Sequence, residues 1–331
     1  MARISKQDKV FVAGSTGLVG KSITKILKKY EYGLKENNGE ILTPTRKELD
    51  LTSTVEVKEW MAENKPNVVI VAAAKVGGIF ANSAYPADFL LENMKIQNNL
   101  IEASWNLGVK KFLFLGSSCI YPKYSCQPIK EDELLTGQLE TTNEWYAIAK
   151  ISGIKLCQSL RKQYGFDAIS LMPTNLYGPH DNFHPLNSHV MPALIQKFRE
   201  AKSKNLSKVT CWGTGSPLRE FMYVDDLAEA IVFCLENWDP SAKDAPVDKK
   251  GEPLNYLNVG TGKDISIKDL AQKIANIVGF KGDILWDKSK PDGTPRKLLD
   301  ISKISEMGWA PLVDLNEGIK KTVSFLDGYE C

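Results

Sequence analysis

The sequence has no long apolar run and no excess of charge of one sign. Its 331 residues carry 42 basic and 40 acidic side chains, a net charge of +2, so the composition favours neither nucleic acid nor a membrane surface as a partner. The first apolar run, Val10–Ala13, ends at Gly14 and is too short for a signal-peptide core or a membrane span. We therefore expect a cytoplasmic protein that binds neither nucleic acid nor a membrane.

Histidine and cysteine are also scarce, and their spacing does not favour a metal site. The three histidines, His180, His184 and His189, fall within ten residues but in no helical HxxxH context, and Asp181 is their only acidic neighbour. No cysteine is close to them in the sequence, so we predict no bound metal. Without a secretion signal the cysteines are expected to be reduced thiols. They are Cys119, Cys126, Cys157, Cys211, Cys234 and Cys331.

Short apolar runs alternate with helical stretches through the first half of the chain. Continuous Val, Ile and Leu runs between helices are typical of a parallel sheet that is covered on both faces. The sequence therefore predicts an α/β fold built on a doubly wound, parallel Rossmann sheet. The expected strands are Val10–Ala13, Glu40–Thr43, Val68–Ala73, Lys111–Leu115 and Ala168–Met172, and the expected helices are Leu18–Tyr30, Thr54–Asn64, Phe89–Leu107 and Glu144–Tyr164.

A glycine-rich loop with GxxGxxG spacing follows the first strand and opens the first helix. Glycines let the backbone turn tightly and approach a pyrophosphate, whose charge the helix N-terminus favours. Such loops also arise for purely steric reasons, but the position of this one predicts dinucleotide binding. Its residues are Gly14, Ser15, Thr16, Gly17, Leu18, Val19 and Gly20.

The end of the second strand indicates which dinucleotide is bound. An NAD enzyme usually has an acidic residue here, whereas this chain has Arg46, with Lys47 beside it. A guanidinium suits a 2′-phosphate, so NADP(H) is favoured over NAD; two solvated surface charges are the alternative. We expect Asp50 and Leu51 at the adenine edge, and Ala72–Ala74 to pack closely against the cofactor.

The pattern becomes less regular after Pro173, and we interpret the later segments as a smaller, mixed α/β substrate-binding lobe over the carboxyl ends of the strands. The expected division is a NADP-binding Rossmann domain of residues 1–178 plus about 219–262, and a lobe of about 179–218 plus 263–331. Asp225 and Asp226 are expected to cap a helix. The expected elements are a loop at His180–Ser188, a helix at Pro192–Lys202, a strand-turn-helix unit at Arg219–Asn237, a surface excursion at Asp239–Pro253, a strand at Leu257–Gly260 and a helix at Ile267–Val278.

Tyr146 and Lys150 form the strongest catalytic signal. Residues four apart lie on one helix face, so the Lys150 ammonium, together with an oxidised nicotinamide, is expected to lower the pKa of the phenol from about 10. Ser117, at the end of the fourth predicted strand, is expected to hydrogen-bond the reacting carbonyl beside Tyr146. The alternatives are an ordinary amphipathic helix and a structural serine.

These motifs resemble the extended short-chain dehydrogenases, and longer strings resemble one family within them, the GDP-L-fucose synthases. This family carries out two epimerisations, at C3 and C5, and then an NADPH-dependent 4-reduction of GDP-4-keto-6-deoxy-mannose. The strings are GSSCIYPK (Gly116–Lys123), the Tyr146–Lys150 helix, MPTNLYGPHDNFHP (Met172–Pro185), NSHV (Asn187–Val190), REFMYVDD (Arg219–Asp226), NVGTG (Asn258–Gly262) and KPDGTPRKLLD (Lys290–Asp300).

The resemblance implies a role for each matching residue. Ser117, Tyr146 and Lys150 match the reductive triad, and Cys119 and His189 match the acid/base pair of the epimerisation. A ketone acidifies the protons on its neighbouring carbons, and thiol and imidazole pKa values of about 8.5 and 6.5 suit their transfer. A small buried core residue is the alternative for Cys119, and the sequence leaves open which of the pair acts at each carbon.

Further contacts are implied for both ligands. Lys197 stands where some family members carry Arg, which keeps the charge but loses the fork geometry. A surface side chain is the alternative for each substrate residue. The other cofactor residues are Leu115, Gly116, Ser117, Ser118, Lys150, Pro173, Thr174, Asn175, Leu176 and His189, and the substrate residues are Lys197, Trp212, Arg219, Asp292 and Lys297.

Two rival functions remain open at this point. A sugar-nucleotide 4,6-dehydratase is expected to carry carboxylates after the catalytic Ser or Thr, where this chain has Ser118 and Cys119, and a 4-epimerase usually retains NAD, against which Arg46 argues. A non-catalytic NADP-binding regulator has no need of Tyr146 and Cys119. By analogy with the family, a homodimer is expected through the helices around 90–106 and 144–163.

Overall fold

The computed structural model describes residues 3–184, 188–290 and 292–328. Its main sheet has six strands, all parallel, in the order β2-β1-β3-β4-β5-β9. The chain proceeds from β1 to β2 on one side and to β3 on the other, so the direction of winding reverses beside β1. Crevices at the carboxyl ends of the strands at such a reversal bind ligands. The strands are β1 (Lys9–Ala13), β2 (Glu40–Leu42), β3 (Val68–Val71), β4 (Lys111–Leu115), β5 (Ala168–Pro173) and β9 (Tyr256–Val259).

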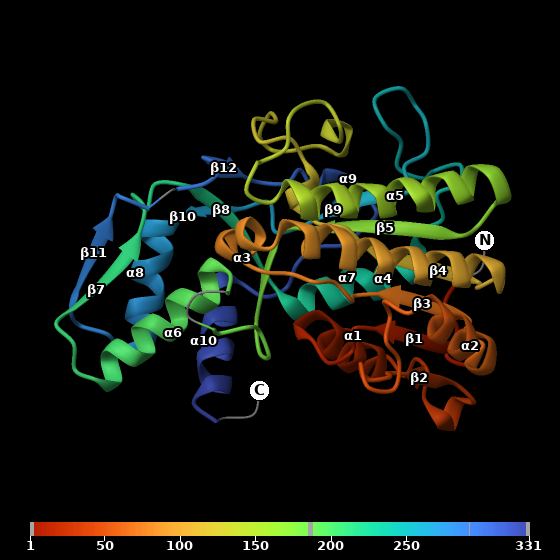
Figure 1. The fold of residues 1–331 in the computed structure, drawn as a ribbon, viewed down its shortest axis with the longest axis horizontal. Coiled ribbons are helices and arrows are strands. Elements are labelled where there is room, and N and C mark those ends of the chain that lie inside the picture. Colours follow the sequence, from red (N-terminus) through yellow and green to blue (C-terminus); the bar gives the residue numbers. More distant parts are fainter. Residues whose placement is uncertain (1–2, 185–187, 291, 329–331) are drawn as a thin grey trace.

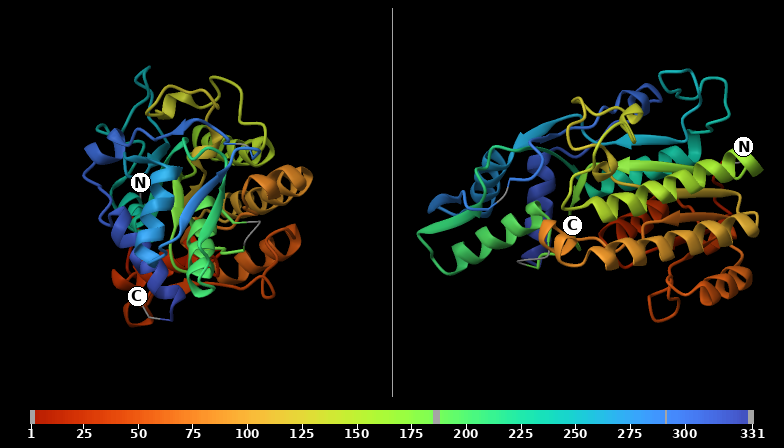
Figure 2. Two further views of the ribbon diagram at one scale, coloured as in Figure 1. Left: turned by 90° about the vertical axis from the view of Figure 1, so that its left-hand side faces the viewer. Right: turned by 45° about the horizontal axis from the view of Figure 1, so that its top comes forward.

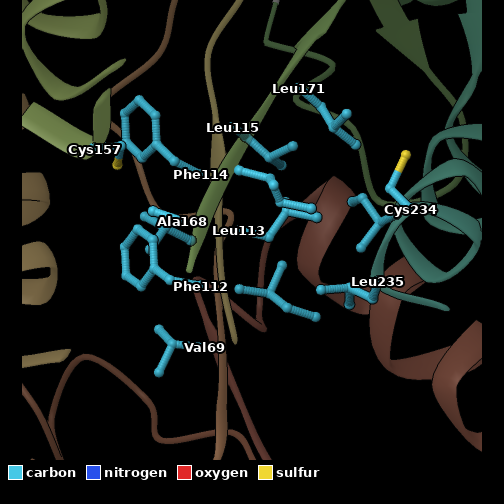
Figure 3. Packing of buried hydrophobic residues seen from close by; sticks show 14 of the residues in the cluster. Val69, Phe112, Leu113, Phe114, Leu115, Cys157, Ala168, Leu171, Cys234 and Leu235 are labelled. Atoms are coloured by element: carbon cyan, nitrogen blue, oxygen red, sulfur yellow. The ribbon is translucent and has the colours of Figure 1, made fainter. Parts of the chain in front are cut away.

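Both faces of this sheet are buried under helices, as the continuous apolar strands require. Successive side chains of a strand point to opposite faces, and β4 shows the result: Phe112 and Phe114 lie on the side of Cys157, whereas Leu113 lies toward Cys234 and Leu235 (Figure 3). Cys157 belongs to α5 (Glu144–Tyr164), and Cys234 and Leu235 belong to α7 (Val224–Asn237).

The helices form one layer on each face of the main sheet (Figure 1). On one face α4 (Pro86–Asn106) packs against α5 and α2 (Thr54–Asn64), with the short α3 (Ile79–Ala84) before it. On the other face α1 (Leu18–Lys29) packs against α7. Ion pairs of Lys25 with Asp225 at 3.1 Å and of Lys29 with Glu229 at 2.7 Å join these two helices.

A second lobe lies beyond the carboxyl ends of the main strands (Figures 1 and 2). One small sheet has the order β10-β8-β12, with β6 also paired to β8, and β7 pairs with β11. Phe198, Leu270 and Ile319 belong to a hydrophobic core of its own. The strands are β6 (Asn175–Tyr177), β7 (Lys208–Trp212), β8 (Leu218–Tyr223), β10 (Asp264–Ser266), β11 (Asp283–Asp287) and β12 (Arg296–Lys297), and the helices are α6 (Val190–Ser203), α8 (Ile267–Val278) and α10 (Leu315–Leu326). The short α9 (Ser302–Glu306) packs against β9 of the main sheet.

The predicted fold class is confirmed, since the parallel sheet, its two helical layers and the mixed smaller lobe are all present. The domain boundaries stay a prediction; Leu299, Ile304 and Trp309 pack into the core of the main sheet although they follow residue 263. The Asp239–Pro253 segment is an irregular loop with one bridge, between Val247 and Pro253.

Asp225 and Asp226 do not cap α7, contrary to the prediction. Residue Tyr223 occupies the N-cap position and makes no side-chain cap bond. The Asp226 carboxylate instead accepts hydrogen bonds from the backbone N–H groups of Leu312 at 3.0 Å and Val313 at 3.1 Å, and Asp225 pairs with α1. Across the residues that the structure describes, no helix has the length and apolarity that crossing a membrane requires.

Candidate active site

A cavity of about 1310 Å³ lies between the carboxyl ends of the main strands and the second lobe. It exceeds the roughly 300–1,000 Å³ of an ordinary small-molecule site, and so has room for two ligands side by side. All the predicted catalytic and substrate residues line it, and so do all the predicted cofactor residues except Ser15. Ser15 is buried below the loop, where its Cα lies 2.6 Å from the position a Cβ of residue 20 would take.

The glycine-rich loop fits a pyrophosphate, but its glycines are there for different reasons. Gly14 has a positive φ of 85°, and a Cβ on it would lie 2.7 Å from the Ala73 Cα; a Cβ on Gly20 would overlap the carbonyl oxygen of Gly14. Close packing of the backbone therefore requires glycine at positions 14 and 20. A Cβ on Gly17 would meet only the Gly14 oxygen at 3.6 Å. Gly17 faces the cavity at the N-cap of α1, where its bare backbone and the free N–H groups of the first turn suit an anion.

Arg46 lies at the far end of this cavity, beyond β2, together with Asp50 and Leu51. Its side chain is exposed, and Lys47 does not line the cavity. The Asp50 carboxylate accepts two hydrogen bonds from Thr52, from the backbone N–H at 2.9 Å and from the hydroxyl at 2.8 Å. These bonds lower the pKa of Asp50 and hold its carboxylate to its own loop, so that Arg46 is the group available for a phosphate.

Tyr146 and Lys150 lie on one face of α5, as predicted, with the Lys150 Nζ 5.9 Å from the centre of the phenol ring. The same Nζ donates a hydrogen bond to the Leu115 carbonyl at 2.9 Å. Burial lowers the pKa of Lys150 to about 7. The pKa of Tyr146 is raised, chiefly by burial and also by the charge of Cys119, although its hydrogen bond with Ser117 acts in the opposite direction.

The prediction that the pKa of the Tyr146 phenol is lowered is therefore wrong for the protein without a bound nicotinamide. The physical reason is that the same burial that removes the phenol from water also weakens the charge of its cationic neighbour. A phenol with a raised pKa stays protonated at neutral pH. It can then donate a proton to an oxygen that becomes an alkoxide, which is what a reduction requires.

Cys119 contacts a cation that comes from a distant part of the chain. It lies in η2, the 3₁₀ turn Ser118–Ile120 after β4, where its backbone N–H donates to the Ser117 hydroxyl at 3.2 Å. Its Sγ lies 3.2 Å from the Lys297 Nζ. Burial acts to raise the thiol pKa, but Lys297, Ser117 and Arg219 together outweigh it, so that the pKa of Cys119 is lowered.

His189 faces the same cavity from the N-cap position of α6, without capping that helix through its side chain. Burial and the charge of Lys297 both lower the imidazole pKa. Lys297 thus acts on both members of the predicted acid/base pair. The sequence assigned it to the substrate, and the structure shows that its ammonium contacts the Cys119 thiol.

Two strand pairings bring Lys297 to this place. In β12 it lies opposite Arg219 of β8. Two residues later Leu299 forms a parallel bridge with Ile129, in the loop that follows Cys119. The lysine is therefore fixed from the second lobe on one side and from the Cys119 loop on the other.

The remaining predicted substrate residues surround the outer part of the cavity. Lys197 donates to the Thr210 carbonyl at 2.9 Å, and the exposed ring of Trp212 has the Lys290 Nζ 5.6 Å from its centre. Asp292 accepts hydrogen bonds from the Thr214 backbone N–H at 2.7 Å and hydroxyl at 2.8 Å. Asp292 therefore closes its own loop against β7.

Several residues of the cavity wall were not found from the sequence. Asn143 precedes α5, one turn before Tyr146, and its buried Oδ1 has no hydrogen-bond partner among the residues that the structure describes. Trp286 of β11 lies under Gly215, whose Cβ would come within 2.8 Å of the indole ring. Its position depends on the pairing of β7 with β11, and no local motif marks it.

The histidine cluster does not gather around a shared centre. His180 lies 3.2 Å from the Lys21 Nζ, through its Nδ1, and its ring packs edge-on against Phe325. In the described ranges, no three side chains of metal-binding type come together. Parts of the motifs, at 185–187 and 291, and the cysteine at 331 lie outside those ranges.

Comparisons with known proteins agree with this arrangement. A family model described as the NAD dependent epimerase/dehydratase family matches residues 10–247. A probable GDP-L-fucose synthase of Oryza sativa subsp. japonica is 54% identical over 318 residues, covering 96% of this chain and 91% of the relative.

Two solved structures share the whole fold. A GDP-6-OMe-4-keto-L-xylo-heptose reductase from C. jejuni has a TM-score of 0.88 and 35% identity, covering 99% of both chains. A GDP-L-fucose synthetase from Naegleria fowleri bound to NADP has a TM-score of 0.84 and 28% identity, covering 99% of this chain and 97% of the other. The chain therefore belongs to the NAD dependent epimerase/dehydratase family and, within it, to the group of the GDP-L-fucose synthases.

Proposed function

We propose that this chain converts GDP-4-keto-6-deoxy-D-mannose to GDP-L-fucose, by epimerisation at C3 and C5 followed by NADPH-dependent reduction of the 4-keto group. One observation carries the proposal. The same cavity holds a Ser117–Tyr146–Lys150 group suited to a carbonyl and a Cys119–Lys297 pair suited to proton transfer at carbon. A simple reductase needs only the first of these groups.

The epimerisation uses the acidity that the ketone gives to its neighbouring carbons. Cys119 suits the base that removes a proton, because the Lys297 ammonium stabilises its thiolate. His189 suits the acid that returns a proton to the opposite face of the ring. A lowered pKa makes its imidazolium a stronger acid, although a smaller fraction carries the proton at neutral pH. The enolate oxygen formed in between is expected at Tyr146 and Ser117.

The reduction uses the phenol as an acid. Tyr146, protonated because burial raises its pKa, donates its proton to the 4-keto oxygen, while Ser117 holds that oxygen by a hydrogen bond. NADPH supplies the hydride when it is bound. Gly17 and the first turn of α1, which line the cavity, would hold its pyrophosphate, and Arg46 would hold its 2′-phosphate.

The GDP part of the substrate is assigned to the outer cavity. Lys197 and Arg219 supply positive charge for the diphosphate, and Trp212 offers an exposed aromatic face. Asp292 is expected to act indirectly, through the loop that it closes with Thr214.

The test is to follow NADPH absorbance with purified protein and freshly prepared GDP-4-keto-6-deoxy-D-mannose, and to identify the product by chromatography. Oxidation of NADPH with GDP-L-fucose as the product is the expected result. Oxidation that yields only the unepimerised 4-alcohol would make the protein a sugar-nucleotide 4-reductase. Binding of NADPH with no turnover of this substrate would refute the proposal.

The protein is also proposed to form a homodimer through α4 and α5, which lie side by side on one face of the sheet (Figure 1). Large apolar side chains on this face are exposed: Leu91 at 56%, Trp145 at 41% and Ile148 at 37%. Sedimentation of the wild type as a dimer and of an Ile148→Glu variant as a monomer is expected. A wild type that sediments as a monomer at micromolar concentration would contradict this assembly. The cytoplasmic location stays a prediction.

A further inference from the structure

A fully buried carboxylate, that of Glu220 in β8, joins three segments of the chain behind the cavity wall. Its side chain is 0% exposed. The Oε1 atom accepts hydrogen bonds from the backbone N–H groups of Thr261 at 2.6 Å and Gly262 at 2.7 Å. The Oε2 atom accepts one from the backbone N–H of Leu299 at 3.0 Å. A buried charge is costly unless it is bonded in this way, so these bonds fix the carboxylate.

The surroundings of Glu220 hold it from further sides. A Cβ on Gly260 would overlap the Oε1 atom, so the chain can approach this carboxylate only with glycine there. The backbone carbonyl of Glu220 accepts hydrogen bonds from the Asn175 amide at 2.7 Å and the Thr174 hydroxyl at 3.3 Å. Both of these residues line the proposed cofactor part of the cavity.

Glu220 is bonded to the segment that carries Lys297. Arg219, its neighbour in the sequence, lies opposite Lys297 in the β8–β12 pairing. Leu299, which Glu220 binds through Oε2, follows Lys297 by two residues. The short β12 has only two residues of its own. The Glu220–Leu299 bond, together with the backbone bonds of Leu298 and Asp300 with Ile129, therefore constrains where the Lys297 ammonium lies, 3.2 Å from the Cys119 Sγ.

We propose that Glu220 is a positioning residue that holds Lys297 against Cys119 and thereby keeps the thiol ready for proton transfer. Its use in epimerisation rests on the proposed function. Its effect on the reactivity of the thiol does not, and can be measured without any sugar nucleotide.

The experiment replaces Glu220 by Gln and measures the rate of Cys119 alkylation by iodoacetamide across a pH series. A glutamine can keep one acceptor, but its NH₂ group faces one of the backbone N–H donors and releases that segment. Alkylation follows the thiolate fraction, so the pH midpoint for Cys119 should move upward and its rate at neutral pH should fall about tenfold or more. Peptide mass spectrometry separates Cys119 from the exposed Cys126, which serves as an internal reference.

The matched control is Asp226→Asn. Asp226 is also a buried carboxylate that accepts two backbone N–H bonds, from Leu312 and Val313, but it does not line the cavity. This variant should lower the melting temperature as Glu220→Gln does, and leave the Cys119 profile unchanged. A shift of the Cys119 profile in both variants would mean that general loosening is responsible, and would overturn the proposal.

A double-variant comparison makes the test specific. Lys297→Met should shift the Cys119 profile by itself, and adding Glu220→Gln should then cause no further shift. An additional shift in the double variant, or a wild-type profile in folded Glu220→Gln, would overturn the proposal. If Glu220→Gln does not fold, Glu220→Asp provides the same comparison, since the shorter chain cannot reach Leu299 and both loop N–H groups together. Failure of the wild type to make GDP-L-fucose would refute the proposed function but not this inference.

Discussion

Replacing Lys297 by Met separates two roles for this residue, substrate binding and activation of Cys119. Methionine keeps an apolar stem of similar length and removes the ammonium. Two unit charges 3.2 Å apart attract by about 5 kcal/mol at an effective dielectric constant of about 20, and by about 1 kcal/mol in bulk water. The pair is partly exposed and Arg219 and Ser117 remain near the thiol. We therefore expect proton exchange to slow by about one to three orders of magnitude.

The assay is deuterium incorporation at C3 and C5 of GDP-4-keto-6-deoxy-D-mannose in heavy water, with NADPH omitted so that only proton transfer is observed. The expected result is a fall in the maximum exchange rate with little change in the substrate concentration at half-saturation. Lys290→Met is the control, because it removes the same charge near Trp212 without touching Cys119.

The opposite pattern would refute the reasoning. If Lys297 serves only to bind the substrate, as expected from the sequence, its loss should raise the half-saturating concentration and leave the maximum exchange rate unchanged. A full exchange rate at saturating substrate would show that the contact with the thiol has no part in the reaction.

Three further predictions test the other parts of the site. Tyr146→Phe should slow NADPH oxidation about 10²- to 10⁴-fold and slow deuterium exchange at C3 and C5 less, because Ser117 still binds the enolate oxygen. Equal loss of both would contradict the role of the phenol as the proton donor of the reduction. In a fluorescence titration, Arg46→Ala should weaken NADPH binding about 10- to 100-fold, because charge-assisted hydrogen bonds are lost, and should change NADH binding little. The control Lys47→Ala alters a residue outside the cavity and should bind both cofactors as the wild type does. Burial raises the pKa of Glu131 from 4.5 to about 7. Between these pH values the folded protein therefore binds more protons than the unfolded chain, and the free energy of unfolding falls as pH rises. The stability that protonated Glu131 contributes is fully present below pH 4.5 and is lost as pH rises through 7. The free energy of unfolding, measured with urea at pH 5 and pH 7.5, should fall by up to about 3 kcal/mol less in Glu131→Gln than in the wild type. The same fall in both proteins would show that Glu131 does not titrate in this range.

The main sheet could be predicted because its information is local. The Val68–Val71 strand is apolar throughout and buried on both faces, a pattern that needs no knowledge of the partner strands. Helix α2 begins after Ser53, whose hydroxyl accepts from the Glu56 backbone N–H. Its predicted bounds, and those of α5, are the ones observed. Strand runs and helix caps are read within one window of sequence.

In the second lobe two helices were predicted, α8 with the observed bounds and α6 to within two residues, but most of the strands were not. The missed strands depend on partners that are distant in the sequence. Strand β7 pairs with β11, more than 70 residues later, and β12 is defined as a strand only by its pairing with β8. Pairings of this kind leave little trace in the local sequence. Helix α10 is an exception, because Asp314 caps it by accepting from the Asn316 and Glu317 backbone N–H groups. That signal was present in the sequence and could have been recognised.

The functional site shows the same difference between local and distant sequence information. The motifs correctly brought Ser117, Tyr146 and Cys119 into one cavity, because each follows or begins an element of the main sheet. What activates them was not predictable from those motifs. The cation beside Cys119 lies 178 residues further along the chain, and its place depends on β12 and on the buried Glu220. A motif therefore identifies a nucleophile or base, whereas its pKa is set by charges that only the tertiary fold brings near. It follows that substitutions in β8 and β12 should change the chemistry of Cys119 even where they leave every residue of the GSSCIYPK string intact.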